Sequence, residues 1–470
     1  MRLYNTLSGG TETFTPDDDI VKMYVCGVTP YSASHVGHAM RAVVFDVIRR
    51  YLEFSGHSVK HVENFTDIDD KMIDRAAENG TTTIALAESN IQAYLREMDA
   101  LNIKRAHLYP RATQEVPKIR EIISGLIEKG LAYAVDGDVY FRVRSYEEYG
   151  ALGRRSLDDM VAGARVEVDE TKKEDPMDFA LWKGHKPGEP FWSSPWGPGR
   201  PGWHIECSAM AMGYLGATVD IHGGGQDLVF PHHENEMAQS EGFTGQQMAK
   251  FWVHNGLMRL GDARMSKSDG NLVTVADALE HHSSDALRLF FLSSHYRGPL
   301  TYTEEAVDAQ ERGLERLRNA ADLPALPDST ESLDQAVHEK SFVDAMDDDL
   351  NTAQASGAVF NFVRDANTKI DAGEFLAGNR EAASSVLNRF DSIFDVLTVG
   401  VESKVPSEEI KRLIEERSQA RKSRDFARAD EIRDELTQKG VVLEDTREGT
   451  RWKLRGDAGC RSVAPVESEG

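Results

Sequence analysis

The sequence has 470 residues, of which 40% are hydrophobic, so it is long enough for about two to four domains and too apolar to be disordered throughout. Its 78 acidic and 54 basic residues give a formal net charge of −24, which argues against a protein that coats nucleic acid with its whole surface. Its three cysteines, Cys26, Cys207 and Cys460, are too few and too widely spaced for a disulfide framework. No apolar stretch reaches roughly 18 residues and no signal peptide is recognisable, so we expect a cytoplasmic protein without membrane spans.

The first 65 residues predict a parallel α/β unit. The apolar, Val-rich segment 20–27 predicts a buried strand that ends at a glycine, and segment 59–65 predicts a second strand. The apolar positions of 43–48 indicate a helix between them. A further strand–loop–helix pattern begins at residue 218, as expected where such a fold resumes after an interruption.

The interruption, residues 111–200, has a different character. It combines a helix at 116–129, a strand at 139–143 and a stretch rich in Gly, Pro and Trp, so we interpret it as an insertion. Beyond the sheet, residues 306–400 are helical and acidic. The last module contains helices at 407–422 and 427–439 and a short strand at 441–443. The predicted class is therefore α/β: a Rossmann-like parallel sheet with an insertion, then a helical bundle and a small mixed C-terminal module.

The sequence His35-Val36-Gly37-His38 lies between the first predicted strand and the helix. Glycine lets a phosphate approach the backbone, and the N-terminus of a helix favours anions. Two imidazoles three residues apart lie on one face of a helical turn and can donate to phosphate oxygens. The motif predicts a nucleotide site; the alternative is two ordinary surface histidines.

A polar segment at 264–271 reads RMSKSDGN. A glycine-bounded loop that carries Lys267 can close over a nucleotide and offset the charge that develops on a transferring phosphate. A charged surface loop would look similar, but the pairing with HVGH is far more specific than either segment alone. Lys267 is thus a candidate catalytic residue beside His35 and His38.

Four potential metal ligands occur in three separate segments. His232 and Glu236 are four residues apart at the start of a predicted helix, so they share a face. Cys207 follows a Gly-Trp-His segment, and Cys26 ends the first strand. Two thiolates, an imidazole and a carboxylate suit tetrahedral zinc, whereas two buried structural cysteines are the alternative interpretation.

A run of three glycines, 223–225, follows His222 and precedes Gln226-Asp227. Glycines at a strand end allow a ligand to approach the backbone closely. Asp227 could accept hydrogen bonds from a ribose or an ammonium group, and an ordinary turn is the other interpretation.

HVGH followed about 230 residues later by RMSKS resembles the two signatures of the class I aminoacyl-tRNA synthetases. Val36, Arg264 and Asp269 stand where the family usually has Ile, Lys and Leu. Further segments are similar to the cysteine-specific family, cysteinyl-tRNA synthetases: YVCGVTPYSASHVGH, NFTDIDDKMIDRA, GARVEVDE with DFALWK, RPGWHIECSAM, HGGGQDLVFPHHENE, AMDDDLNTAQA and the C-terminal ARKSRDFARADEIRDELTQKGVVLEDTREGTRWK. The resemblance covers residues 1 to about 455.

The resemblance implies formation of cysteinyl-adenylate from cysteine and ATP, with Mg²⁺ accompanying ATP, followed by transfer to the 3′ end of tRNA(Cys). It also implies one zinc ion that binds the substrate as a thiolate, so no hydrolytic editing domain is needed to reject serine. The implied site residues fall into four groups: His35, His38 and Lys267 in catalysis; these three with Gly37, His222 and Gly224 on ATP; Cys26, Gly27, Thr66, Trp203 and Asp227 on cysteine; and Cys26, Cys207, His232 and Glu236 on zinc. We expect a monomer.

The corresponding domain boundaries are 1–110 and 201–246 for the two halves of the catalytic Rossmann domain, 111–200 for the connective insertion, 247–305 for a stem-contact region with the RMSKS loop, 306–400 for the bundle, 401–456 for the anticodon-binding module and 457–470 for a disordered tail. Residues 401–457 carry 14 basic and 14 acidic residues, so nearly all of the acidic excess lies outside this module. Candidate tRNA contacts there are Arg421, Arg424, Phe426, Arg428 and Trp452, by stacking and phosphate pairing. A core phenylalanine and a solvated arginine face are the alternative.

The nearest competing function is a cysteine ligase that passes the same adenylate to an amino sugar, as in mycothiol synthesis. Such enzymes resemble the catalytic half and lack the C-terminal module, which this chain has. A short HxGH nucleotidyltransferase would lack RMSKS, and a non-catalytic zinc-dependent RNA-binding protein would be expected to lose His38 or Lys267.

Overall fold

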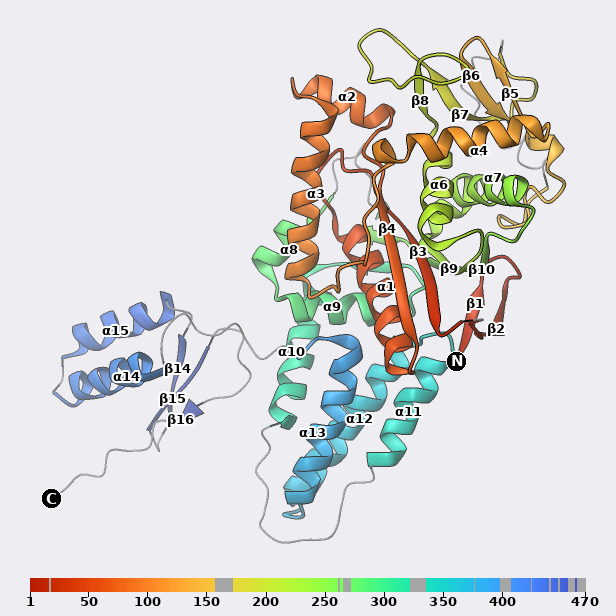
Figure 1. Ribbon diagram of the computed structural model, residues 1–470. Coiled ribbons are helices and arrows are strands. Elements are labelled where there is room, and N and C mark those ends of the chain that lie inside the picture. Colours follow the sequence, from red (N-terminus) through yellow and green to blue (C-terminus); the bar gives the residue numbers. More distant parts are fainter. Residues whose placement is uncertain are drawn as a thin grey trace. The chain divides into compact units, whose positions relative to one another are not determined.

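The computed structural model (Figure 1) describes residues 1–16, 18–156, 172–260, 263–264, 272–321, 335–375, 377–397, 407–423, 425–438, 441–446, 449–454 and 461–462. The chain forms two compact units. The first consists of Met1–His281, Phe291–Thr303 and Val343–Gln354; the second consists of His282–Phe290, Glu304–Phe342 and Ala355–Gly470.

A four-stranded parallel sheet in the order β10-β9-β3-β4 forms the centre of the first unit (Figure 1). Its strands are β3 (Ile20–Val28), β4 (Ser58–Phe65), β9 (Val219–Gly225) and β10 (Ala249–Asn255). Helix α1 (Val36–Phe54) packs on β4 and β9, while α6 (Trp203–Leu215) packs on β3 and β4. The predicted α/β class with a parallel sheet is confirmed. The carboxyl ends of parallel strands meet at one edge, which is where such folds bind ligands.

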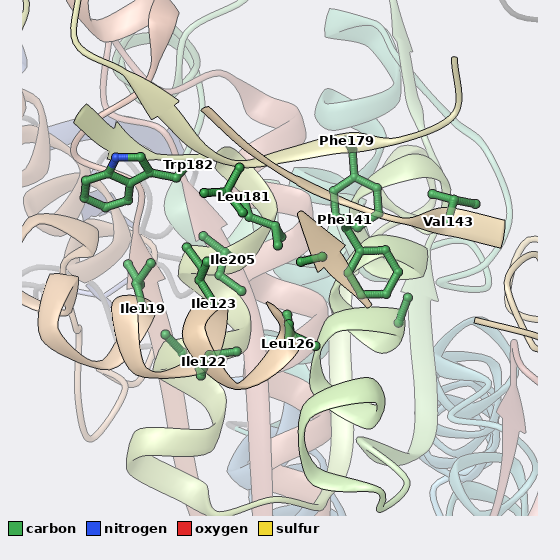
Figure 2. Packing of buried hydrophobic residues seen from close by; sticks show 14 of the residues in the cluster. Ile119, Ile122, Ile123, Leu126, Phe141, Val143, Phe179, Leu181, Trp182 and Ile205 are labelled. Carbon is green, nitrogen blue, oxygen red and sulfur yellow. The ribbon is translucent and has the colours of Figure 1, made fainter. Parts of the chain in front are cut away.

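The segment between β4 and α6 packs around a hydrophobic core that it shares with Ile205 and Ala209 of α6 and with Ala238 of α7 (Glu234–Thr244) (Figure 2). Helix α4 (Val116–Glu128) presents Ile119, Ile122, Ile123 and Leu126 at helical spacing, and their side chains face those of the antiparallel sheet β5-β6-β7-β8. The elements of this segment are α2 (Asp70–Glu78), α3 (Thr83–Ala100), α4, β5 (Ala132–Val135), β6 (Asp138–Phe141), β7 (Phe179–Gly184) and β8 (Gly199–Pro201).

Strand β6 is shorter than the predicted strand at 139–143. Its pairing ends at Phe141, and the backbone N–H of Val143 donates to the buried Asp178 carboxylate at 2.9 Å. A side chain therefore replaces the ladder partner, and Val143 begins a single 3₁₀ turn. The pattern of apolar residues in the sequence does not show where a side chain takes the place of a neighbouring strand as a hydrogen-bond partner.

The remaining elements of the first unit flank the sheet. A hairpin of β1 (Arg2–Asn5) and β2 (Gly10–Thr13) lies beside β10, through a bond from the Thr6 N–H to the Trp252 carbonyl of 2.9 Å. The others are α7 (Glu234–Thr244), β11 (Met258–Leu260), β12 (Ala263–Arg264), α8 (Val275–His281) and β13 (Leu300–Tyr302). Residues 343–354, which comprise the end of one helix, the connection after it and the start of the next helix, also belong to this unit.

The second unit is predominantly helical. Buried Arg288 donates to the Phe394 carbonyl from Nε at 3.0 Å and from Nη2 at 2.8 Å, next to the rings of Phe342 and Phe390. Its elements are α9 (Ser284–Leu292, up to residue 290), α10 (Glu304–Ala321), α11 (Gln335–Asp347, up to residue 342), α12 (Thr352–Asp371, from residue 355), α13 (Ala377–Phe394), α14 (Ser407–Lys422), α15 (Phe426–Gln438), β14 (Val441–Thr446), β15 (Gly449–Leu454) and β16 (Arg461–Ser462). The helices of the last module follow the predicted spacing closely.

Candidate active site and metal centre

The four predicted metal ligands come together at the carboxyl edge of the sheet. Cys26 lies near the end of β3, Cys207 in the first turns of α6, His232 just before α7 and Glu236 in its first turn. All four are at most 3% exposed. Their ligand atoms lie within 4.8 Å of one another.

The spacing of these atoms fits a single small cation. The two Sγ atoms are 3.8 Å apart, and the edge between sulfurs of a tetrahedron with metal–sulfur bonds of about 2.3 Å is roughly 3.8 Å. Cys207 Sγ lies 3.6 Å from His232 Nε2, and Cys26 Sγ lies 3.3 Å from Glu236 Oε1. Two soft sulfur donors, together with one imidazole nitrogen and one carboxylate oxygen, form a donor set that suits zinc.

Protonation in this cluster depends on burial and on neighbouring charge. Burial raises the pKa of the Cys26 thiol, and that thiol's hydrogen bond lowers the pKa of Cys207 to about 6. Burial disfavours a charged His232, but Glu236 and Cys207 outweigh it and raise the pKa of His232 to about 10. Burial likewise opposes ionisation of Glu236, yet His232 and His222 hold its pKa well below the usual range. A divalent cation would therefore displace protons from Cys26 and His232, so its affinity falls as pH falls.

A second set of donors overlaps the first. His222 and His233 join Cys26 and Glu236 in a group with equally short separations. His222 Nε2 lies 3.2 Å from Glu236 Oε2, and His233 Nδ1 lies 2.8 Å from His254 Nε2. The resemblance implies that His222 contacts ATP, a role that stays a prediction, and it names neither His233 nor His254. The structure places His222 in this buried candidate metal site, where it can orient Glu236.

The HVGH segment caps its own helix. His35 Nδ1 accepts from the Gly37 N–H at 3.2 Å, and His38 Nδ1 accepts from the His35 N–H at 3.4 Å. The two rings stack with centroids 3.7 Å apart. Because each Nδ1 accepts a hydrogen bond, the neutral rings carry their proton on Nε2. The motif thus places two imidazole N–H donors at a helix N-terminus.

The predicted cysteine-binding residues do not all share one cavity. Trp203, 40% exposed, lines a cavity of about 900 Å³ and stacks on the His232 ring with centroids 4.3 Å apart. Asp227 lines a different cavity of about 430 Å³. Thr66 is buried, and its hydroxyl accepts from Asn64 Nδ2 at 3.3 Å.

Two glycines of the site are required by close approach. A Cβ on Gly27 would lie 1.7 Å from the Asn64 carbonyl oxygen, which is backbone and cannot move aside. A Cβ on Gly224 would lie 2.8 Å from Cε1 of the His233 ring. Gly27 therefore lets the end of β3 lie against the Asn64 backbone, and Gly224 lets the end of β9 lie against His233 of the candidate metal site.

Several predicted residues lie outside the described part of the chain: Lys267 and Asp269 of the RMSKS segment, Arg424 and Cys460. The side chains of Phe426 and Trp452 are likewise undescribed. Arg421 is exposed on α14. Arg428 is paired within its own module, 2.7 Å from Glu416 and 3.0 Å from Glu431, so a phosphate contact by Arg428 would compete with two carboxylates.

Comparison with known proteins assigns the three parts of the chain. Residues 13–312 match the catalytic domain of class I tRNA synthetases (C), 341–402 match the DALR domain and 406–452 match the cysteinyl-tRNA ligase anticodon binding domain. The cysteine–tRNA ligase of Dehalococcoides mccartyi is 53% identical over 463 residues, covering 97% of this chain and all of the relative. That of Geobacillus thermodenitrificans is 50% identical, covering 96% of this chain and 99% of the relative.

Solved structures agree with the fold. Methionyl-tRNA synthetase of Mycobacterium tuberculosis in complex with methionyl-adenylate superimposes with a TM-score of 0.62 at 16% identity, over 84% of this chain and 94% of that one. Among the described helices, none combines the length and apolar character needed to cross a membrane. Full-length identity near one half and three consecutive domain matches show that the chain belongs to the cysteine–tRNA ligase family of class I aminoacyl-tRNA synthetases.

Proposed function

We propose that this chain activates L-cysteine with ATP and Mg²⁺ and transfers it to tRNA(Cys), and that zinc held by Cys26, Cys207, His232 and Glu236 selects cysteine by its thiol. The observation that carries the zinc assignment is the buried cluster of two thiols, an imidazole and a carboxylate, in a chain of this family. We also propose that the reaction takes place in the cytoplasm and that the chain acts as a monomer.

Zinc at this site would supply a Lewis acid that a thiol coordinates far better than a hydroxyl does. The chain's own residues supply the rest of the selection. Trp203 covers the His232 ring at the cavity wall, and the lack of a side chain at Gly27 lets the strand end beside Cys26 lie against the Asn64 backbone. A site that requires a specific partner atom rejects the analogue lacking it by roughly 10⁴-fold or more, so discrimination against serine needs no editing domain.

The activation step needs charge stabilisation at the α-phosphate of ATP. His35 and His38 place two imidazole N–H groups at the N-terminus of α1, where the backbone dipole also favours an anion. Lys267 would add a positive charge from the RMSKS segment as pyrophosphate leaves. In this proposal the cysteine carboxylate attacks the α-phosphorus, and these groups hold the developing charge.

The amino-sugar alternative has no support in the comparisons. Residues 406–452 match an anticodon binding domain, and the relatives at about half identity are cysteine–tRNA ligases along their entire length. We therefore propose tRNA, rather than an amino sugar, as the acceptor.

The test compares Cys207→Ser with Cys460→Ser, a matched control at the cysteine that no proposed ligand set includes. Metal analysis should give one zinc per chain for wild type and Cys460→Ser and a strong loss for Cys207→Ser. Cysteine-dependent ATP–pyrophosphate exchange and charging of tRNA(Cys) should fall with the metal. A full zinc complement in Cys207→Ser would show that the ligand set is wrong. Wild-type protein that does not charge tRNA would refute the function.

A further inference from the structure

Three polar side chains are buried together beside strand β3. They are Arg41 of α1, Glu63 of β4 and Tyr94 of α3, here called the Arg41 cluster. Arg41 Nη2 donates to Glu63 Oε1 at 2.7 Å and to Tyr94 Oη at 3.0 Å. The Tyr94 hydroxyl donates to the same Glu63 oxygen at 2.6 Å. The side chains of Arg41 and Glu63 are each only 7% exposed.

The other arm of the guanidinium reaches a proposed metal ligand. Arg41 Nη1 donates to the backbone carbonyl of Cys26. The pairing of β3 with β4 is irregular at this point, so Cys26 and Gly27 have no register partner on β4. Two side chains take over the unpaired backbone groups: Arg41 binds the Cys26 carbonyl, and Asn64 Oδ1 accepts from the Gly27 N–H at 2.9 Å.

Burying an ion pair costs desolvation free energy, and an apolar pair of similar volume often stabilises a fold as well or better. Arg41 Nε, moreover, finds no hydrogen-bond partner among the described residues. What an apolar pair could not provide is the forked donor that binds a carboxylate and a carbonyl at once.

Arg41 also lies three residues after His38 on α1, and hence on a neighbouring position of the same helix face. One guanidinium therefore joins the helix that carries HVGH to the strand end that carries Cys26. Loss of this link would free the Cys26 backbone to rotate, and its Sγ would move with it.

We infer that Arg41 is a positioning residue, which fixes the Cys26 carbonyl and thereby orients the Cys26 thiolate toward zinc and the substrate thiol. Glu63 and Tyr94 hold the guanidinium in place for this purpose. The inference rests on the proposed function, because it assigns Arg41 a role in the zinc site proposed above.

The test uses two variants that preserve different parts of the cluster. Arg41→Lys keeps the charge opposite Glu63 and removes the arm that reaches the Cys26 carbonyl. The double variant Arg41→Met/Glu63→Leu removes the buried charges together and keeps an apolar fill. Arg50→Met is the matched control: Arg50 lies on the same helix, 10% exposed, and pairs with the buried Asp46 at 2.8 Å.

We expect zinc affinity to fall about ten- to a hundredfold in Arg41→Lys and in the double variant, as for other partners of metal ligands. With cobalt(II) in place of zinc, the thiolate absorption should weaken in both, and the KM for cysteine should rise more than the KM for ATP. Arg50→Met should match wild type in all three measurements. Wild-type zinc affinity and cobalt spectrum in Arg41→Lys, or in a folded double variant, would overturn the inference. Wild-type protein without zinc or cysteine activation would refute the proposed function instead.

Discussion

Three consecutive aspartates, Asp347, Asp348 and Asp349, occupy three different environments, so the same substitution should have three different effects. Their side chains are 45%, 67% and 6% exposed, respectively. Asp347 accepts from the Tyr51 hydroxyl at 2.7 Å. Among the described residues, the Asp348 carboxylate pairs with Arg2 alone, at a long 3.9 Å.

Asp349 has the densest set of contacts of the three. It accepts from the Tyr4 N–H at 2.8 Å, from the Tyr296 hydroxyl at 2.9 Å and from Arg297 Nε at 2.7 Å. Hydrogen bonds to a charged group contribute about 1.5–3 kcal/mol each, and removal of the acceptor leaves the buried Tyr296 hydroxyl unpaired. We expect Asp349→Ala to lower the free energy of unfolding by about 3–5 kcal/mol.

By the same reasoning, Asp347→Ala should cost about 1–2 kcal/mol for one hydrogen bond, and Asp348→Ala should stay within about 0.5 kcal/mol of wild type. The assay is urea unfolding of the full chain, followed by tryptophan fluorescence, with all three variants under identical salt and pH. Equal losses in the three variants, or a loss below about 1 kcal/mol for Asp349→Ala, would refute the reasoning from burial and hydrogen bonding.

Three further outcomes can be checked separately. Lys267→Ala should slow cysteine-dependent pyrophosphate exchange at least a hundredfold, by about 3 kcal/mol in the transition state, with little change in the KM for cysteine; an unchanged rate would exclude its role. Zinc removal by a chelator should lower the melting temperature and expose the thiols of Cys26 and Cys207 to a thiol reagent, whereas unreactive thiols would speak against a metal-bridged site. Burial lowers the pKa of His61 to about 4, so the unfolded chain takes up a proton first and stability should fall as pH drops from about 6.5 to 4, by at most about 3 kcal/mol. His61→Leu should flatten that part of the pH–stability curve, and an unchanged slope would contradict the assignment.

Local features of the fold were predictable because their causes are local. The apolar run of β3, the helix after HVGH and the two helices of the last module all have spacings that identify the element within one segment. The types of residue suited to zinc were visible in the same way. Their spatial proximity was not, since Cys26 and Cys207 are 181 residues apart and no short motif joins them.

Other features depend on tertiary contacts that leave no periodic trace. His222 lies in β9, which is buried at six of its seven positions, so alternation along the strand cannot show which face a side chain meets. The Arg41 cluster draws on α1, β4 and α3, and its partner Cys26 lies on a fourth element. The sequence shows an arginine within an apolar helix. Its role can be inferred only from the structure, which shows that Arg41 binds the Cys26 carbonyl.

The order of the proposed zinc ligands along the chain has a consequence for biosynthesis. Cys26 precedes the segment between β4 and α6, while Cys207, His232 and Glu236 follow it. At about 5–20 residues added per second, roughly 10–40 seconds separate synthesis of the first ligand from synthesis of the last. The core of the intervening segment includes Ile205, Ala209 and Ala238, so it is completed only when the last ligands are also being synthesised. Acquisition of the ion would thus be a late event on the ribosome, and a chain terminated before residue 232 could not retain it.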